Sequence, residues 1–341
     1  MRCAVYRGPG VIELDECPEP EIGPGEVLIR VLACGVCMTD IKTVKKGHPL
    51  IKPPCVLGHE VAGRVEEVGE GVSSVSPGDL VVAAPYVPCG ACYFCRRGQY
   101  TLCERLFEHY LRPGGFAELV VAPAEIVKKG LYKIKKSVPP EVACLTEPLA
   151  CCLHGIRNLG LEPADTLLIV GSGPMGLMHL LLAKSFGAAQ VIVTDLLEDR
   201  LKIAAELGAD AAINAREDVR SAVREFTDGR GADKVVVAVG VPEAISTGLI
   251  SVRRGGTVLL FGGCPPGSQL TIDPNRIHYG EVTLVGSFGF TPRDFHDAAR
   301  LIEEGRVRLE RIVTHKAGLD RLLELVEIVS RAEGLKAVVT P

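Results

Sequence analysis

Four cysteines in one short segment give the strongest local signal for metal chemistry in the sequence. Cys89, Cys92, Cys95 and Cys103 follow the pattern C-x2-C-x2-C-x7-C. Four thiolates from one loop can surround Zn²⁺ tetrahedrally and leave no coordination position open, which is the arrangement of a structural zinc site. An iron–sulfur cluster uses a related spacing, but here the fourth cysteine is too far along the chain and no proline follows it. Disulfides are the remaining alternative, which a reducing compartment disfavours.

A second set of metal-binding residue types is dispersed along the chain. It comprises Cys37, His59, Glu60 and Glu147. Each of these alone would more often serve packing than chemistry. Together they offer one thiolate, one imidazole and carboxylates, a combination that suits a catalytic zinc with a position left for water or substrate. Cys34 and Cys37 also form C-x-x-C, but the βαβ pattern of a thioredoxin-like redox protein does not surround them.

The segment GSGPMG indicates a third chemistry, the binding of a dinucleotide. The segment spans residues 171–176 and includes Gly171, Gly173, Pro174, Met175 and Gly176. The segment lies between an expected strand at 166–170 and an expected helix at 174–186. In a G-x-G-x-x-G turn the first glycine allows the tight turn, the second lets the backbone approach a pyrophosphate, and the third allows close helix packing. A turn whose glycines serve packing alone is the alternative.

An acidic residue follows at the spacing that dinucleotide sites use. Asp195 stands at the end of the next expected strand, 190–194, where its carboxylate can accept hydrogen bonds from both ribose hydroxyls. The same charge would repel a 2′-phosphate, and Leu196 and Leu197 occupy positions where NADP enzymes often carry arginine. We therefore predict NAD as the cofactor. Arg200 is near enough to border the adenine ribose, although a solvated position on a helix is an equal alternative.

The elements that must position these residues differ between two parts of the chain. Up to about residue 145 the sequence is rich in glycine and proline, with short β-branched runs at 26–32, 60–68 and 79–84. Several short strands at that rhythm predict a β-rich, barrel-like domain. The last fifty or so residues return to a mixed pattern, with amphipathic helices expected near 294–304 and 319–330.

From residue 165 onwards, strands and helices alternate. Continuous apolar runs, as expected of strands buried on both faces, occur at 166–170, 190–194, 234–239, 257–261 and 282–285. Helical stretches lie between the earlier runs and end at glycines. This alternation predicts a doubly wound parallel sheet of the α/β class.

The composition excludes several classes of protein. The 341 residues carry 38 basic and 42 acidic side chains, and the formal net charge of −4 lacks the electrostatic signature of a nucleic-acid binder. No stretch reaches the roughly 18–20 continuous apolar residues of a membrane helix. Glycine and proline interrupt the start before the apolar region of a signal peptide can form. We therefore expect a cytoplasmic protein of two domains that binds neither nucleic acid nor membrane.

The sequence contains 13 cysteines, more than an ordinary core requires. Five of them have metal assignments, so 13 − 5 leaves eight, which we expect to be packing thiols, Cys144, Cys151 and Cys152 among them. In a reducing compartment none of the thirteen is expected to form a disulfide.

Several motifs occur in the order found in zinc-dependent medium-chain dehydrogenases. They are CMTD at 37–40, GHEVAGRVEEVG at 58–69, PGDLV at 77–81, the cysteine segment, EPLACCLHG at 147–155 and GSGPMG at 171–176. The sequence resembles this family over essentially its whole length. Within the family it resembles the sorbitol (polyol) and threonine dehydrogenase branch, because Glu147 and Pro148 stand where the alcohol dehydrogenase branch has a cysteine ligand.

The resemblance implies an α/β protein built from a split catalytic domain and a nucleotide-binding domain. A GroES-like β-barrel catalytic domain is expected over residues 1–149 and 291–341, and a Rossmann domain over residues 150–290. The segment 282–285 lies where relatives pair their Rossmann domains. The resemblance therefore implies a homotetramer or a homodimer.

The resemblance also assigns roles around the catalytic zinc. It implies that Cys37, His59 and Glu60 surround the metal, and that Glu147 is either a direct ligand or bonded to its water. Thr39 matches the hydroxyl that takes the proton of the substrate.

Two further residues of this segment match or depart from the family pattern. Asp40 matches the carboxylate that supports the histidine ligand. Lys42 stands where the family commonly has the histidine that ends the proton relay. A lysine can pass protons only where its surroundings strongly favour the neutral amine, and it could instead bind a phosphate or carboxylate or remain solvated. Solvent is then the acceptor beyond Thr39.

On the cofactor side, the resemblance implies two more groups of residues. Phe261, Gly262 and Gly263 match the turn beside the nicotinamide. Ser287 and Phe288 fall near the domain junction on the same cleft. His278 and Tyr279 are expected to form a packed loop pair.

These expectations combine into one reaction. A zinc- and NAD-dependent enzyme oxidises a secondary alcohol, for which a polyol is the first candidate, to a ketone by hydride transfer. Two zinc ions per chain are expected, one catalytic and one structural. The alternative within the enzyme class is an L-threonine 3-dehydrogenase or a simple secondary-alcohol dehydrogenase. The alternative outside it is a zinc-bearing NAD-binding protein without activity, against which the presence of Cys37, His59, Glu60 and Asp195 argues.

Overall fold

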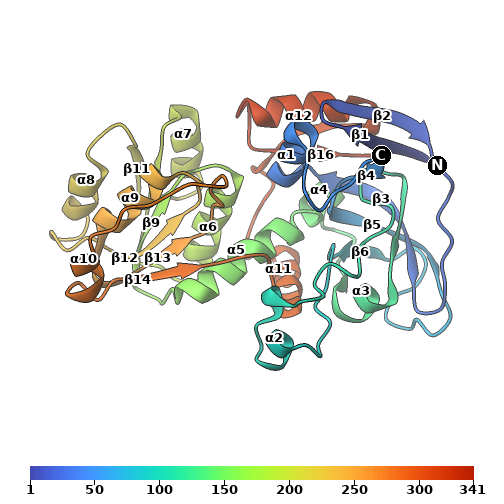
Figure 1. Cartoon of the computed structure of the whole chain (residues 1–341), viewed down its shortest axis with the longest axis horizontal. Coiled ribbons are helices and arrows are strands. Elements are labelled where there is room, and N and C mark those ends of the chain that lie inside the picture. Colours follow the sequence, from blue (N-terminus) through green and yellow to red (C-terminus); the bar gives the residue numbers. More distant parts are fainter. The chain divides into compact units, whose positions relative to one another are not determined.

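The structure is a computed structural model that describes residues 1–341 and divides them into two compact units. The first unit contains Met1–Ala150 and Phe290–Pro341, and the second contains Cys151–Gly289. The chain therefore leaves the first unit once and later returns to it (Figure 1). The sequence predicts breaks after residues 149 and 290, each one residue away from the division in the structure.

The larger sheet of the first unit has seven strands, and every pairing except β15 with β16 is antiparallel. Its order is β15-β16-β3-β5-β6-β8, and β7 pairs with β3. The strands are β3 (Val27–Gly35), β5 (Glu60–Val68), β6 (Leu80–Ala83), β7 (Leu119–Ala122), β8 (Leu131–Lys133), β15 (Val313–Ala317) and β16 (Lys336–Val339). β16 pairs with β3 and places Val338 opposite Gly35. The C-terminal part of the chain thus completes the N-terminal sheet.

A smaller sheet of the same unit contains a disulfide. Its order is β2-β1-β4, with β1 (Arg2–Gly8), β2 (Val11–Glu16) and β4 (Cys55–Val56). Cys3 in β1 is bonded to Cys17, which directly follows β2. The expectation that no cysteine pairs is therefore wrong for these two. The cause is the antiparallel register of the hairpin, which places their Cα atoms 6.2 Å apart, within the range that a disulfide spans.

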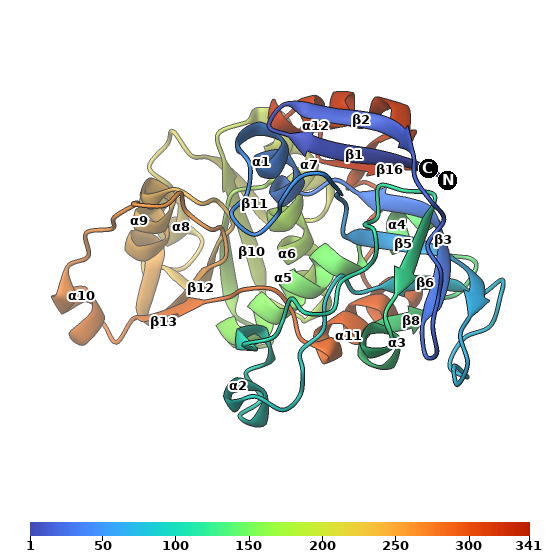
Figure 2. The same cartoon turned by 45° about the vertical axis from the view of Figure 1, so that its right-hand side comes forward.

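The helices of the first unit are short. They are α1 (Met38–Lys46), α2 (Tyr93–Arg96), α3 (Ala124–Lys129), α4 (Pro140–Ala143), α11 (Pro292–Glu303) and α12 (Leu322–Ser330), with 3-10 turns η1 (Tyr100–Leu102) and η2 (Leu319–Arg321). A longer helix, α5 (Thr146–Leu159), carries the chain from the first unit into the second. α12 lies beside the hairpin of β1 and β2 in both views (Figure 1, Figure 2). No helix of the structure is both long enough and apolar enough to cross a membrane.

The second unit is a six-stranded parallel sheet with helices between its strands. The strand order is β11-β10-β9-β12-β13-β14. The strands are β9 (Thr166–Val170), β10 (Gln190–Asp195), β11 (Ala211–Asn214), β12 (Ala232–Val237), β13 (Val252–Leu260) and β14 (Thr283–Gly286). The helices are α6 (Pro174–Ser185), α7 (Glu198–Glu206), α8 (Val219–Glu225), α9 (Pro242–Ser251) and α10 (Pro274–His278). This order reverses between β9 and β12, as in doubly wound dinucleotide-binding folds, and it confirms the predicted α/β class.

Candidate functional site

Cys37 lies between β3 and α1, where it caps the helix. Its Sγ accepts a hydrogen bond from the N–H of Thr39 at 3.5 Å, and its own N–H donates to Oδ2 of Asp40 at 2.9 Å. This reciprocal arrangement is a capping box with a cysteine at the N-cap position. The two bonds fix the position of the thiol at the end of the sheet.

His59 and Glu60 reach the same place from the start of β5. Glu60 opens β5 opposite Gly35, the last residue of β3. A Cβ atom at position 35 would lie 1.9 Å from Oε2 of Glu60, so only glycine leaves room for that carboxylate. As a result, the ligand atoms of Cys37, His59 and Glu60 all lie within 4.8 Å of one another. We call these three residues the mixed cluster.

Asp40 contacts the imidazole of the mixed cluster. Its Oδ1 lies 3.5 Å from Nδ1 of His59, and Asp40 itself is buried. Burial lowers the pKa of His59, but the charges of Asp40 and Cys37 outweigh burial and hold that pKa well above its usual value. Because Asp40 takes the Nδ1 side of the ring, Nε2 is the nitrogen left for another partner.

Lys336 is a charged neighbour of the cluster that sequence reasoning missed. It comes from β16, and its Nζ donates to Oε1 of Glu60 at 2.5 Å, with side chains that are 6% and 0% exposed. Burial lowers the pKa of Lys336, but the charge of Glu60 outweighs burial and raises it above its usual value. Oε2 of Glu60 is buried without a hydrogen-bond partner. An unpartnered buried carboxylate oxygen is unfavourable unless a cation or donor meets it, so this atom fits the role of a metal ligand.

Glu147 lies in the first turn of α5, outside the tight group of ligand atoms in the mixed cluster. Only 7% of its surface is exposed. Burial raises its pKa to about 7; the charge of His59 opposes this shift and that of Glu60 adds to it. Near neutral pH this carboxyl can therefore either donate or accept a hydrogen bond.

Thr39 and Lys42 are two exposed residues of α1, the helix that Cys37 caps. Oγ1 of Thr39 lies 3.7 Å from Sγ of Cys37. Lys42 is exposed and forms no ion pair in the structure. Residues three positions apart share one side of a helix, so the hydroxyl and the ammonium group lie on the same side of α1.

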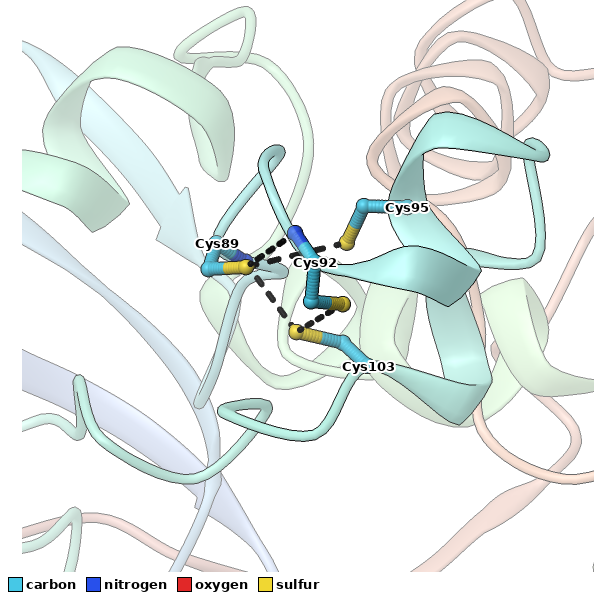
Figure 3. A group of neighbouring side chains, drawn as sticks. All are labelled: Cys89, Cys92, Cys95 and Cys103. Carbon is cyan, nitrogen blue, oxygen red and sulfur yellow. Dashed lines mark hydrogen bonds between the residues drawn. The ribbon is translucent and has the colours of Figure 1, made fainter.

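The four cysteines of residues 89–103, which we call the thiol cluster, gather around a common centre (Figure 3). Their Sγ atoms all lie within 4.8 Å of one another, and all four thiols are free. Cys92 is the N-cap of α2, Cys95 lies within that helix, and Cys103 follows η1. The structure therefore contradicts the disulfide alternative for this segment.

Backbone N–H groups point at the sulfurs of the thiol cluster. The N–H of Cys92 donates to Sγ of Cys89 at 3.4 Å, and the N–H of Cys89 donates to Sγ of Cys103 at 3.3 Å. Backbone N–H groups lower the pKa of Cys92 to about 6, whereas burial raises that of Cys103. Four sulfurs that converge and also receive N–H donors fit a closed metal–thiolate centre.

In the second unit, the glycine turn joins β9 to α6. Gly171 has φ +99°, and a Cβ atom there would lie 2.1 Å from Cγ2 of Val239. A Cβ atom on Gly176 would lie 1.9 Å from the carbonyl oxygen of Gly171. Gly173 is the N-cap of α6. A side chain at the first or third glycine of the motif would therefore clash with neighbouring atoms. The N-terminus of α6 directly follows the second glycine.

Asp195 and Arg200 both lie beside this turn. Oδ2 of Asp195 accepts from the N–H of Ser172 at 2.7 Å, and its Oδ1 accepts from the N–H of Leu197 at 3.0 Å. Nη1 of Arg200 is 3.4 Å from where a Cβ atom of Gly173 would stand, and its Nε is buried without a hydrogen-bond partner. The structure thus favours the position of Arg200 beside the dinucleotide turn over the solvated alternative.

The remaining residues expected near the nicotinamide follow the ends of two strands. Phe261, Gly262 and Gly263 come directly after β13, and Ser287 and Phe288 come directly after β14. A Cβ atom at position 262 would lie 2.6 Å from the backbone of the loop after β12, so these loops pack closely. Oγ of Ser287 is buried without a partner, whereas Phe288 is 58% exposed. All five lie at the edge of the sheet where the glycine turn also lies.

Known proteins resemble this chain in both sequence and structure. Residues 23–134 match the alcohol dehydrogenase GroES-like domain, and residues 174–304 match the zinc-binding dehydrogenase domain. The chain is 38% identical over 336 residues to L-threonine 3-dehydrogenase of Pyrococcus horikoshii, which covers 96% of this chain and 94% of that one. It is 35% identical over 340 residues to sorbitol dehydrogenase of Halalkalibacterium halodurans, which covers 98% and 97%.

Solved structures extend this similarity to three dimensions. The crystal structure of a protein from Sinorhizobium meliloti 1021 bound to NADP superposes with a TM-score of 0.92. The two chains are 32% identical, and the match covers 100% of this chain and 99% of that one. The similarity therefore includes the split first unit as well as the parallel sheet.

Proposed function

Because the chain belongs to the family of zinc-dependent medium-chain dehydrogenases, we propose that it oxidises a polyol at a secondary hydroxyl with NAD⁺. Membership in this family makes it an oxidoreductase of secondary alcohols that uses zinc and a nicotinamide dinucleotide, as the sequence predicts. The observation that carries the proposal is the mixed cluster, in which a thiolate, an imidazole and a carboxylate converge within 4.8 Å.

The mixed cluster would hold the catalytic zinc. Its donor set suits a site with an open position, and the unpartnered Oε2 of Glu60 supports this assignment. Zinc bound there supplies Lewis acidity toward the substrate oxygen near neutral pH. Asp40 holds the ring of His59 in one orientation, and Lys336 balances the charge of Glu60.

Thr39 transfers the proton of the substrate, and Glu147 binds one of its hydroxyl groups. Thr39 accepts the proton of the substrate hydroxyl and passes it to solvent on the exposed side of α1. Glu147, which is buried and titrates near neutral pH, can bond to a second hydroxyl of the substrate. That second contact is the reason for proposing a polyol rather than a simple alcohol.

Asp195 supports NAD as the preferred cofactor. Two backbone N–H groups hold its carboxylate at the end of β10, where it would accept hydrogen bonds from ribose hydroxyls. A 2′-phosphate at that place would meet its negative charge. Arg200 beside Gly173 is the opposing influence, because a guanidinium also binds phosphates.

The thiol cluster would hold a second, structural zinc. Four sulfurs close the coordination shell and leave no position for substrate. Metal analysis is therefore expected to give two zinc ions per chain.

An exposed sheet edge supports a homodimer or homotetramer. β14 is the last strand of the parallel sheet, and Thr283 and Gly286 in it are exposed. Light scattering coupled to size exclusion would give the number of copies, and a monomer would contradict this part of the proposal.

L-Threonine is the second candidate substrate, favoured by the 38% identity to a threonine dehydrogenase. Its carboxylate requires a fixed positive charge. Lys42 lies five residues after Cys37, is exposed and has no ion pair. Arg293, in contrast, already forms an ion pair, with its Nε 3.6 Å from Oδ2 of Asp297. Lys42 is therefore the better candidate for that contact.

A substrate panel tests the proposal. Zinc-loaded protein is mixed with polyols, L-threonine and 2-alkanols, with NAD⁺ and NADP⁺ in parallel, and NAD(P)H absorbance is followed. We expect the highest kcat/KM with a polyol and NAD⁺. A higher value with threonine would replace the proposed substrate, and a preference for NADP⁺ would contradict the role given to Asp195. Absence of turnover with every alcohol would favour the NAD-binding protein without activity.

A further inference from the structure

The second unit contains a cavity at the edge of its sheet opposite to the glycine turn. The cavity has a volume of about 670 Å³ and is lined by residues of α8, α9 and α10, of the loop before β12 and of the start of β13. In a parallel sheet all strands begin at one edge and end at the other, and the glycine turn and Asp195 lie where β9 and β10 end. The cavity is thus separate from the dinucleotide site. Its size lies within the range typical of sites for small molecules.

Six arginines line this cavity, and no acidic side chain does. They are Arg220 and Arg224 of α8, Arg230 before β12, Arg253 and Arg254 of β13, and Arg276 of α10. Because the whole chain has a net charge of −4, this concentration of positive charge is a local property. A concave surface lined by one sign of charge attracts ions of the other sign.

Most of this positive charge is not neutralised by the protein. Arg230 pairs with Asp228 at 3.1 Å, and Arg253 pairs with Asp233 at 2.5 Å. The other four arginines form no ion pair. Two of them, at positions 220 and 224, are four residues apart on one side of α8 and repel each other. A bound anion would remove this repulsion.

Arg276 is held in place within the positively charged group. Its Nε donates to the carbonyl oxygen of Leu249 at 2.6 Å, and its Nη2 donates to that of Val252 at 2.9 Å. Burial and the charges of Arg220 and Arg224 lower its pKa below the usual value of arginine, and the charge of Asp273 opposes this shift only in part. The guanidinium thus has a fixed position close to two other cations, as in a site prepared for an anion.

Ser251 belongs to the lining, but its hydroxyl is not accessible from the cavity. The residue is 1% exposed, and its hydroxyl has no hydrogen-bond partner. Gly231, with φ +97°, approaches it so closely that a Cβ atom there would lie 2.7 Å from the carbonyl oxygen of Ser251. The cavity wall is therefore closely packed at this point.

We propose that this cavity binds a small molecule that carries two or more linked phosphate groups. Guanidinium groups recognise phosphate oxygens through paired N–H donors, and four arginines without ion pairs exceed what one phosphate requires. The site is independent of the dehydrogenase reaction in position, because it lies where strands begin rather than where they end.

Binding of inorganic triphosphate tests the proposal. Calorimetry is run on the full chain with saturating NAD⁺, so that the dinucleotide site is occupied, and each variant is checked for unchanged circular dichroism and dehydrogenase activity. We expect the double variant Arg220→Gln/Arg224→Gln to weaken binding at least about ten-fold, because charge-assisted hydrogen bonds are lost. Added salt should weaken binding to the unmodified protein.

The matched control is Arg306→Gln/Arg308→Gln, which removes the same charge from two exposed arginines without ion pairs in the first unit. It should leave triphosphate binding unchanged. Equal weakening by both double variants would mean that only net charge matters and would overturn the proposal. So would monophosphate binding as tightly as triphosphate, or no triphosphate binding at all. A change of oligomeric state in Arg220→Gln/Arg224→Gln without triphosphate binding would instead identify an interface between copies.

Discussion

The mixed cluster and the thiol cluster of the first unit are assembled in opposite ways. The outermost thiols of the thiol cluster, Cys89 and Cys103, are 14 positions apart, and the loop between them supplies its own N–H donors. The mixed cluster draws on the ends of β3 and β5 and on Lys336 of β16, which is 276 positions from Glu60. The first arrangement depends on one loop, whereas the second depends on the correct pairing of the whole sheet.

The two clusters also differ in how their charges are satisfied. In the thiol cluster, four sulfurs converge and receive backbone N–H donors, and four ligands would fill a tetrahedral shell. In the mixed cluster, Glu60 is fully buried, has a cation on one oxygen and no partner on the other. The comparison teaches that removing a thiol ligand should mainly affect stability, whereas changes in the mixed cluster should affect chemistry.

The largest effect is expected from Cys37→Ala. Loss of a metal ligand should reduce kcat/KM by at least about 10³-fold, more than the roughly 10–100-fold typical of outer-shell partners. Metal analysis should fall from two zinc ions to one, and circular dichroism should not change. Cys55→Ala, at a free thiol outside both clusters, is the control. Unfolding of Cys37→Ala with retained folding of Cys103→Ser would reverse the two assignments.

Lys336→Met is expected to have the next largest effect. It leaves the buried carboxylate of Glu60 without its cation, and breaking a buried ion pair in this way costs about 3–5 kcal/mol of unfolding free energy. Urea denaturation followed by circular dichroism measures the loss. Lys336→Arg keeps the charge and should recover most of the stability. Wild-type stability of Lys336→Met would show that Glu60 is not charged in the folded protein.

Cys103→Ser tests the thiol cluster and should have a smaller effect. A closed zinc site contributes to stability, so its loss should lower the apparent Tm by roughly 5–10 °C, given about 2–4 °C per kcal/mol for domains of this size. One zinc ion per chain should be lost. At a temperature where the variant is folded, its kcat should stay within about two-fold of the unmodified protein, since the thiols form a group separate from the ligand atoms of the mixed cluster. A loss of activity as large as in Cys37→Ala would contradict the division of roles.

Glu147→Gln gives the smallest of these effects and separates catalysis from cofactor binding. The substitution keeps the size of the side chain but removes the group that titrates near neutral pH. We expect kcat to fall about ten-fold, as for the removal of one polar contact to the reacting substrate. The Kd for NAD⁺, measured by fluorescence, should not change. If kcat and the affinity for NAD⁺ fall by the same factor, Glu147 does not have the proposed role toward the substrate.

The sequence predicts the parallel sheet well, because its strands are buried on both faces and form continuous apolar runs. Leu167, Leu168 and Ile169 of β9, for instance, are fully buried. β11 has no such run, since its four residues AAIN combine small and polar side chains, and it was not predicted. Only the pairing with β10 identifies it as a strand.

The thiol cluster is equally predictable, because its spacing lies within one segment. The side-chain chemistry of Cys37, His59 and Glu60 also identifies them as candidate ligands. The sequence does not show the register in which β3 and β5 pair, and this register brings the three residues together. Lys336 carries no local pattern, and only the pairing of β16 with β3 brings it to Glu60. The same limit applies to the disulfide of the first hairpin and to the arginines of the second unit. Each depends on contacts between elements that no periodicity in the sequence encodes.

The order in which the chain is synthesised gives the pairing of β16 with β3 a biological meaning. Residues 151–289 leave the ribosome as one continuous stretch and can fold as a unit before the remainder is made. The first unit must wait, because β16 and Lys336 follow the whole second unit in the sequence. A chain that is released before β16 is made would expose the edge of β3 and leave Glu60 without its cation. Both defects destabilise the first unit, and quality-control proteases degrade unfolded chains. Formation of the buried ion pair beside the mixed cluster therefore depends on a strand that is synthesised after the whole second unit.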